Sequence, residues 1–327
     1  MAKIIGIGNA LVDILVPLAD ETVLTELRLA KAGMWHVDEA KCDEILLSPV
    51  VAAASRATGG SSGNTIHALS VLGNETAFIG TVGDDAPGRF FAERLRSRGI
   101  EDRLTMVGEG RTGLATTFIT ADGERTFATF LGVAPLIDVD GLHLERYAAA
   151  AGERPNILHV EGYLVQNHDV IEQVLVQAKK AGLLVSYDLA SWNIVRSDHA
   201  FVHHLVEQYV DIVFANEEEA KAFADTDDAE VALDMLATLV GTVVVKVGAR
   251  GAWGRRGTDR HLSAPVFCPR VVDTTAAGDF FAAGFLHGFV REWPLANCLD
   301  MGNRLACKVI QVLGTQIDDE SLRLATL

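Results

Sequence analysis

The chain has 327 residues, of which 49% are hydrophobic and 22% charged, and its formal net charge is −16 at pH 7. This composition is that of a globular protein with a large apolar core, and it excludes an extended disordered chain. The negative charge disfavours nucleic acid or an anionic membrane as a partner, although a local pocket on an acidic protein can still bind an anionic ligand.

The N-terminus and the cysteines indicate a cytoplasmic protein. Gly, Asn and Asp interrupt the apolar run at residues 1–20, and no small-residue cleavage site follows, so the segment does not match a signal peptide. No stretch approaches the roughly 18 apolar residues that a membrane-spanning helix needs. The cysteines form no CxxC pair and are expected to be reduced thiols; they are Cys42, Cys268, Cys298 and Cys307.

Short apolar segments alternate with helical patterns along most of the chain. Segments that are rich in β-branched residues and end in or near Gly, Asn or Asp predict buried strands at 3–8, 76–83, 156–162, 183–189, 210–216 and 242–248. Helical periodicity is clearest at 64–73, 169–182 and 230–240. The alternation predicts an α/β fold in which helices cover both faces of a mostly parallel central sheet.

Two regions interrupt this alternation. Residues 112–132 alternate apolar and polar residues around the turn sequence ADGE, which indicates a β-hairpin, and residues 14–37 contain no clear crossover helix. We expect these regions to form a small sheet separate from the main one. No internal repeat or Pro-rich linker marks a second independent domain, so residues 1–327 are expected to form a single domain.

Polar residues and glycines follow the predicted strands. They are Asn9, Asp13, Gly80, Glu161, Asp188, Asn216 and Gly248. Because open parallel sheets bind ligands beyond the carboxyl ends of their strands, the chemistry is expected at this edge.

Residues 271–289, VVDTTAAGDFFAAGFLHGF, place Asp279 after small residues at the start of an apolar helix. Free backbone N–H groups and the helix dipole favour an anion at such a terminus. A carboxylate would repel a resting phosphate, so Asp279 suits a base that takes a proton from a hydroxyl attacking that phosphate. An ordinary acidic residue in a first helical turn is the alternative, and this segment alone does not decide between them.

Two glycine-containing motifs lie nearer the N-terminus. GIGNALVD at 6–13 is not a dinucleotide fingerprint, because Leu11 stands where the third glycine belongs; Asn9 and Asp13 suit either sugar hydroxyls or a turn. TGGSSGN at 58–64 is not a Walker A loop. Gly60 permits close backbone approach, Asn64 can hydrogen-bond a polyol, and a flexible capped turn is the alternative.

The later motifs are equally ambiguous when taken singly. Asn216 and Glu219 in FANEEEAKAF suit either a hydrated Mg²⁺ or a helix cap. Lys246 and the glycines that follow it in VKVGARGAWG suit a nucleotide border or a hairpin. Arg125 is either a mobile cation that closes over phosphates or a surface residue.

The order and spacing of the motifs resemble the ribokinase-like family, also called the phosphofructokinase B family of sugar and nucleoside kinases. GxGNxxxD, GGxxxN, NxxE and DTxAAGD occur in sequence, and the resemblance runs from Asn9 to about Gly314, closest to the adenosine kinase branch. It implies a ribokinase-like three-layer sandwich with a small β-sheet lid. It also implies ATP-dependent, Mg²⁺-dependent transfer of the γ-phosphoryl group to a primary hydroxyl of a ribosyl substrate, most closely the 5′-OH of adenosine, giving AMP in purine salvage.

The resemblance also implies roles for single residues. Asp279 matches the catalytic base, Arg125 a lid arginine that reaches the phosphates, and the backbone of Ala276, Ala277 and Gly278 the anion hole. The positions that match substrate-binding residues are Asn9, Asp13, Gly60, Asn64, Tyr163 and Leu164. The positions that match ATP-binding or Mg²⁺-linked residues are Asn216, Glu219, Lys246, Gly248 and Gly251. Asp273 and Thr275 match a site for a monovalent cation, often K⁺, in several members.

The nucleobase position departs from the family pattern. Leu164 stands where adenosine kinases carry the ring that stacks on adenine, beside Tyr163. Trp35 or Phe118 could supply a flat surface instead, or belong to the core of the lid. A ribokinase-like or fructokinase-like sugar kinase therefore remains the alternative, with an inactive ligand-binding protein and an NAD-dependent oxidoreductase as weaker ones. Family members are monomers or homodimers, and the sequence favours neither.

Overall fold

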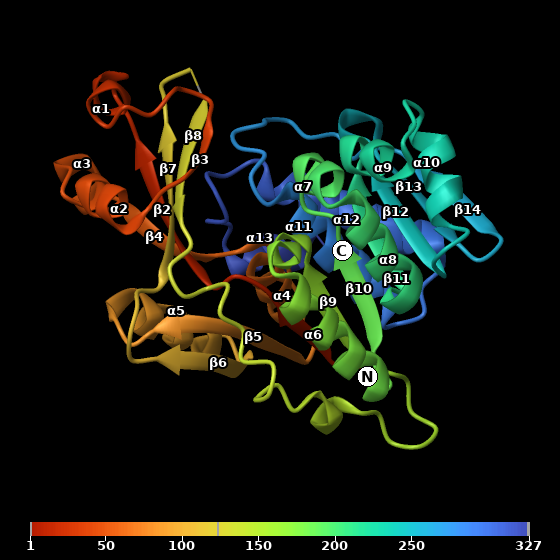
Figure 1. Ribbon diagram of the computed structural model, residues 1–327. Helices are drawn as coiled ribbons and strands as arrows, with labels where there is room; N and C mark the ends of the chain where they lie inside the picture. The colour runs from red at the N-terminus through yellow and green to blue at the C-terminus, as the bar shows by residue number, and fades with distance from the viewer. Residues whose placement is uncertain (1, 123, 326–327) are drawn as a thin grey trace.

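The structure of the protein, a computed structural model, describes residues 2–122 and 124–325 and contains two β-sheets (Figure 1). The larger sheet has nine strands in the order β14-β13-β12-β11-β10-β9-β1-β5-β6. Its strands are β1 (Ile4–Ile7), β5 (Thr76–Gly83), β6 (Glu101–Val107), β9 (Ile157–Glu161), β10 (Leu184–Asp188), β11 (Ile212–Asn216), β12 (Thr242–Lys246), β13 (Ala252–Arg256) and β14 (Asp259–Ser263).

The large sheet is parallel from β6 to β12, and β13 and β14 add an antiparallel edge. Strand β1 is central: Ile4 is aligned with Thr76 of β5 on one side and with Ile157 of β9 on the other. Every residue of β1 is buried, as expected for a strand that is covered on both faces. This register brings the carboxyl ends of β1, β9, β10, β11 and β12 to one edge.

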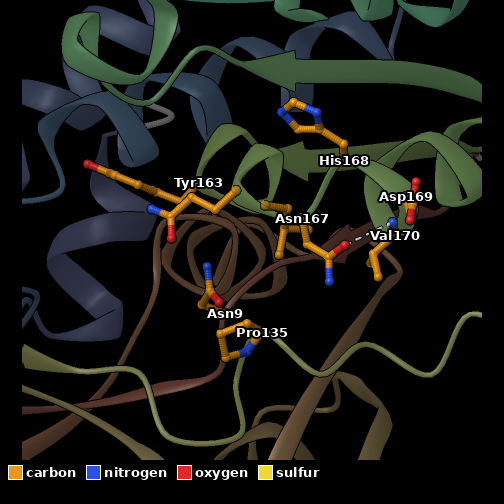
Figure 2. Close-up of a pocket in the computed structure, with 9 residues that line it drawn as sticks. Asn9, Pro135, Tyr163, Asn167, His168, Asp169 and Val170 are labelled. Carbon is orange, nitrogen blue, oxygen red and sulfur yellow. Dashed lines mark hydrogen bonds between the residues drawn. The ribbon is translucent and has the colours of Figure 1, made fainter. Parts of the chain in front are cut away.

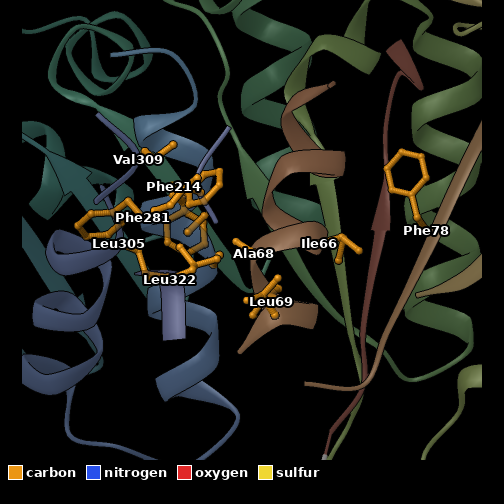
Figure 3. Close-up of a cluster of buried hydrophobic side chains, with 14 of the residues drawn as sticks. Ile66, Ala68, Leu69, Phe78, Phe214, Phe281, Leu305, Val309 and Leu322 are labelled. Atoms are coloured by element: carbon orange, nitrogen blue, oxygen red, sulfur yellow. The ribbon is translucent and has the colours of Figure 1, made fainter. Parts of the chain in front are cut away.

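Helices cover both faces of the large sheet. One face carries α4 (Ser61–Val71), α5 (Ala86–Ser97), α11 (Ala277–Phe289), α12 (Leu295–Val309) and α13 (Asp319–Leu324). The other carries α6 (His168–Lys180), α7 (Trp192–Ser197), α8 (His199–Tyr209), α9 (Glu217–Ala224) and α10 (Ala229–Leu236). The buried apolar side chains form one cluster on each face, and Figure 3 shows part of the first. The predicted α/β fold with helices on both faces of the sheet is therefore confirmed.

The small sheet has five strands in the order β3-β8-β7-β2-β4, and Figure 1 shows it standing apart from the large sheet. Its strands are β2 (Leu11–Pro17), β3 (Met34–His36), β4 (Ser55–Gly59), β7 (Gly113–Ile119) and β8 (Arg125–Phe130). The short helices α1 (Thr22–Glu26), α2 (Glu39–Leu46) and α3 (Pro49–Ala52) accompany it. Three 3₁₀ turns, η1 (Leu144–Tyr147), η2 (Gly162–Gln166) and η3 (Gly248–Arg250), complete the described elements.

The predicted boundaries of the small sheet need two corrections. Strand β2 begins at Leu11, so Asp13 belongs to the small sheet and not to a strand end of the large one. Strand β4 also joins this sheet by pairing with β2, although its sequence SRATG has no apolar run that would signal a strand. Strands β7 and β8 pair antiparallel as the hairpin signal predicted, while Gly123 of the ADGE turn lies outside the described residues.

No helix within residues 2–122 or 124–325 combines the length and hydropathy needed to cross a bilayer.

Helices α11 and α12 pack closely where α11 has a glycine. A Cβ atom at Gly284 would lie 2.5 Å from the Met301 carbonyl oxygen, which is backbone and cannot move aside cheaply. We predict that Gly284→Ala lowers the free energy of unfolding by about 1–3 kcal/mol, because the helices must separate. Urea denaturation measures this difference.

The matched control is Gly63→Ala in α4, where a Cβ atom would meet only ring carbons at 3.7 Å or more. This variant should be as stable as the parent or more stable by up to about 1 kcal/mol, since alanine favours a helix. Equal stability of Gly284→Ala and the parent would contradict the packing argument.

Candidate active site

Asp279 lies in the first turn of α11 and is held by two side chains of α4. Ser61 Oγ donates a hydrogen bond to Asp279 Oδ1 at 2.8 Å, and Asn64 Nδ2 donates to Asp279 Oδ2 at 2.9 Å. Gly60 is the N-cap of α4, with a positive φ of 84° and no room for a Cβ beside the Asn9 carbonyl oxygen. The glycine therefore sets the entry into α4 and, with it, the direction of both donors.

The environment of Asp279 places its titration near neutrality. Burial raises the pKa of Asp279 to about 6, while the hydrogen bonds from Asn64 and Ser61 oppose that rise. At pH 7 the carboxylate is therefore mostly ionised and still basic enough to accept a proton.

The loop before Asp279 presents backbone groups to a cavity. Ala276 is the N-cap of α11 in a left-handed conformation, with φ of 60°, and Ala277 and Gly278 begin the helix. All three line the cavity. The first N–H groups of a helix have no intrahelical acceptor and favour an anion.

Lys246, at the end of β12, brings a partly buried cation to this loop. Its Nζ would lie 3.0 Å from a Cβ at position 278, so a glycine at this position allows the approach. The same Nζ lies 3.1 Å from Asp188 Oδ2, at the end of β10. Burial lowers the pKa of Lys246, but Asp188 and Glu219 outweigh burial and raise it, so the ammonium stays charged.

Asn216 and Glu219 form a reciprocal cap at the start of α9. Glu219 N donates to Asn216 Oδ1 at 2.9 Å, while Asn216 N and Nδ2 donate to the two carboxylate oxygens of Glu219 at 2.7 and 2.6 Å. Burial raises the pKa of Glu219, and nearby Lys246 opposes that rise. The helix-cap alternative is therefore observed, and it leaves the carboxylate facing the cavity.

These residues fit a hydrated Mg²⁺ better than a directly ligated one. Both Glu219 oxygens already accept N–H groups, and no group of three or more potential metal-binding side chains occurs in the described part of the chain. Mg²⁺ usually keeps several waters and is held by few carboxylates together with phosphates.

A second buried carboxylate lies beside Asn9. Asn9 Nδ2 donates to Glu161 Oε1 at 2.7 Å, and Ser62 N donates to Glu161 Oε2 at 3.2 Å. Burial raises the pKa of Glu161 to about 7, while these donors oppose the rise. Glu161 thereby ties the end of β9 to the loop after β1 and to the first turn of α4.

One polar atom near Asp279 lacks a partner. Asn64 Oδ1 is buried and has no hydrogen-bond partner among the residues that the structure describes. A buried acceptor without a donor is costly. Asn64 Nδ2 is therefore engaged by Asp279, while Asn64 Oδ1 is free to accept a hydrogen bond from a hydroxyl of a ligand.

Arg125, the first residue of β8, reaches from the small sheet to the loop that precedes Asp279. Its guanidinium donates to the carboxylate of Asp273, to Thr275 Oγ1 at 2.6 Å and to Thr274 Oγ1 at 2.8 Å. The small sheet is thereby connected to the segment between β14 and α11.

The position matched to a monovalent cation is occupied by N–H donors in this arrangement. Asp273 Oδ1 accepts from Thr275 N at 2.8 Å as well as from Arg125, and Asp273 Oδ2 accepts from Gly314 N at 2.7 Å. A monovalent cation would compete with the Arg125 guanidinium for the same oxygen. As arranged here, Asp273 and Thr275 do not fit such a cation.

Two cavities meet at Tyr163. The larger, of about 1060 Å³, reaches from Ser61 and Asp279 past Lys246 to Gly248 and Gly251. The smaller, of about 380 Å³, is lined by Asn9, Pro135, Tyr163, Leu164, Gln166, Asn167, His168, Asp169 and Val170 (Figure 2). Tyr163 lines both cavities, so its ring lies where the two spaces adjoin.

Neither alternative aromatic platform faces these cavities. Phe118 is fully buried in β7 and belongs to the core, so its interpretation as a base-stacking ring is wrong. Trp35 lies on the edge strand β3, is 41% exposed and lines neither cavity. Phe118 packs in the core of the small sheet, and Trp35 lies on its edge strand.

The structure therefore brings most of the predicted residues to one region. Three further residues belong to the site without a role predicted from the sequence. Ser61 lies within GGSSGN, where the sequence indicates no more than a capped turn, and Glu161 and Asp188 follow predicted strands. Their contacts with Asp279, Asn9 and Lys246 join segments far apart in the chain, which no local pattern reveals.

Asp13 makes the free energy of unfolding of the protein depend on pH. Burial, then the charges of Asp279 and Asp273, raise its pKa to about 7 in the folded protein, above the ordinary value of 3.8. A group with a raised folded pKa stabilises the fold fully below its unfolded pKa and loses that contribution as pH rises through the folded pKa.

We predict that Asp13→Asn gains stability relative to the parent by about 2–3 kcal/mol between pH 5 and pH 8, since only the parent must ionise an acid whose pKa the fold raises. Urea unfolding of both proteins at the two pH values measures the difference. A gap between them that does not change with pH would refute the placement of Asp13 among these carboxylates.

The sequence and the structure of this chain are similar to those of known kinases. Residues 39–322 match the model described as pfkB family carbohydrate kinase. The crystal structure of adenosine kinase from Sinorhizobium meliloti is similar, with a TM-score of 0.86, 30% identity, and coverage of 99% of this chain and 98% of that one.

Two curated relatives carry different substrate names. Adenosine kinase of Saccharomyces cerevisiae is 27% identical over 98% of both chains. Fructokinase-1 of Zea mays is 30% identical over 72% of this chain and 75% of that protein. The chain belongs to the pfkB family of carbohydrate kinases and is a phosphotransferase that acts on a hydroxyl group of a sugar or nucleoside.

Proposed function

We propose that this protein transfers the γ-phosphoryl group of ATP to the 5′-OH of adenosine, giving AMP and ADP. The observation that carries this proposal is the position of Asp279. It lies in the first turn of α11, lines the larger cavity and accepts a hydrogen bond from Asn64, whose Oδ1 has no partner. A base, an alcohol-binding acceptor and an anion site are then within one small region.

Asp279 is the proposed base. With a pKa of about 6 its carboxylate is available at neutral pH to accept the proton of the attacking hydroxyl. Ser61 and Asn64 fix the carboxylate in one orientation, which limits the entropy lost on reaching the reactive geometry. The hydroxyl oxygen then forms a bond to the γ-phosphorus while the bond to the β,γ-bridging oxygen breaks, releasing ADP.

The start of α11 is the proposed anion hole. The N–H groups of Ala276, Ala277 and Gly278 supply partial positive charge to the phosphoryl group as it moves. Lys246, kept protonated by Asp188, adds a full charge next to Gly278. We assign Gly248 and Gly251, at the other end of the same cavity, to the nucleoside part of ATP.

Mg²⁺ would be held by Glu219 and Asn216 through water, and it neutralises charge on the ATP phosphates when bound. The guanidinium of Arg125 would bind the same phosphates. Arg125 belongs to the small sheet, which we propose acts as a lid. Its guanidinium is already at Thr274 and Thr275, next to the anion hole. A site for K⁺ at Asp273 and Thr275 requires that Arg125 move away first.

The acceptor site is assigned to Asn9, Asp13, Gly60 and Asn64, which lie after β1, in β2, before α4 and in α4; Asn64 donates to Asp279. The smaller cavity begins at Asn9 and continues past Tyr163 and Leu164, with Pro135 and Val170 as further apolar walls. This space beyond the sugar supports a nucleoside over a free sugar. A fructokinase-like or ribokinase-like activity is the second candidate, because Leu164 offers no ring to stack on a base.

We predict that Asp279→Asn retains the fold and acceptor binding but loses at least ~10²-fold in turnover, the contribution of a general base. Steady-state ADP formation measures turnover, and calorimetric binding of the acceptor measures its affinity. Glu320→Gln, an exposed acid in the first turn of α13, is the matched control and should turn over like the parent. Turnover of Asp279→Asn close to that of the parent would remove Asp279 from the mechanism.

The substrate is tested by ADP formation with ATP and Mg²⁺, in the presence and absence of K⁺. The acceptors are adenosine, inosine, guanosine, cytidine, ribose and fructose. We expect kcat/KM for adenosine to exceed that for either free sugar by at least ~10-fold, since the smaller cavity supplies contacts that a sugar cannot make. Preference for a free sugar would favour the second candidate instead.

A further inference from the structure

Two cysteines that are far apart in sequence lie together at the wall of the larger cavity. Cys268 belongs to the segment between β14 and α11, and Cys307 belongs to the last turns of α12. Cys268 Sγ lies 3.5 Å from the Cys307 carbonyl oxygen, and Cys307 Sγ lies 3.6 Å from the Phe267 carbonyl oxygen. These reciprocal contacts place the two thiols side by side, and both residues line the cavity.

The two thiols differ in accessibility. Cys268 is partly exposed, whereas Cys307 is 8% exposed and also contacts Gln311 Nε2 at 3.6 Å. Burial, and then contact with the Cys268 thiol, raises the pKa of Cys307 to about 11. The first reaction with a reagent in solution therefore belongs to Cys268, and Cys307 is positioned to react second.

We propose that Cys268 and Cys307 form a dithiol modification site that a small-molecule disulfide converts into an intramolecular disulfide bond. In the first step Cys268 loses its proton, and its sulfur attacks one sulfur of the reagent, releasing one thiol. In the second step Cys307 loses its proton and attacks Cys268 Sγ, releasing the second thiol. Two protein thiols are oxidised and the reagent disulfide is reduced to two thiols, so atoms and electrons balance.

The bond would act on the cavity because it joins two of its walls. The segment at 264–272 also carries Val266, Phe267 and Val271 along the cavity, and Phe267 is 86% exposed. A disulfide would draw this segment toward α12 and break the contact of Cys307 Sγ with the Phe267 carbonyl oxygen. On the proposed function, on which this consequence rests, the oxidised protein binds ATP more weakly.

The experiment treats the folded protein with oxidised glutathione, alkylates the remaining thiols and digests without reductant. Alkylation is carried out in denaturant so that the buried thiols also react, and we expect mass spectrometry to find one linked peptide pair, Cys268 with Cys307, together with alkylated Cys42 and Cys298. The KM for ATP should rise by at least about threefold and return on addition of dithiothreitol, as expected when uniform binding is lost. The KM for the acceptor should not change.

Cys268→Ser should give neither the linked peptide nor the change in KM. Cys42→Ala, in α2 of the small-sheet region, is the matched control and should behave as the parent. A stable glutathione adduct on Cys268 without a link to Cys307 would overturn the site. A linked peptide with an unchanged KM for ATP would overturn the effect on the cavity while leaving the dithiol site in place. Because the link is detected without an activity assay, failure of the proposed function is distinguishable from failure of the site.

Discussion

The structure depends most on one carboxylate held between two helices. Asp279 begins α11, and its two oxygens accept hydrogen bonds from Ser61 and Asn64 of α4. This contact joins segments more than 200 residues apart, so it exists only after both helices have packed on the same face of the large sheet. The orientation of the carboxylate, and the cavity beside it, follow from that packing.

The remaining polar residues at the site compensate for buried charge. Glu161 accepts three N–H donors, two from Asn9 and one from Ser62, and Lys246 lies beside Asp188 with Glu219 nearby. Ionised groups in a protein interior are costly unless they are paired and hydrogen-bonded. On an acidic protein, the partly buried ammonium of Lys246 and the guanidinium of Arg125 next to the start of α11 also provide the local positive charge that an anionic substrate needs.

The small sheet contributes to the site from the opposite side. Asp13 of β2 and Arg125 of β8 face the loop before α11, and Arg125 bonds to both Thr274 and Thr275. Movement of this sheet would therefore carry a carboxylate and a guanidinium toward or away from the reacting groups together. That coupling is the physical basis for treating the small sheet as a lid in the proposed mechanism.

The sequence by itself determined the fold class and a separate small sheet, because hydrophobic periodicity is a local property of the chain. Each short motif taken alone left two interpretations open, and the roles predicted for the site residues came from the order and spacing of the motifs, which resemble one family. The sequence did not reveal β4, whose strand comes from pairing with β2, nor the roles of Ser61, Glu161 and Asp188. The meeting of Cys268 with Cys307, and the occupation of Asp273 by Arg125, were likewise decided by the tertiary structure. Each of these contacts joins residues that are distant in sequence, so only the packed chain brings their side chains together.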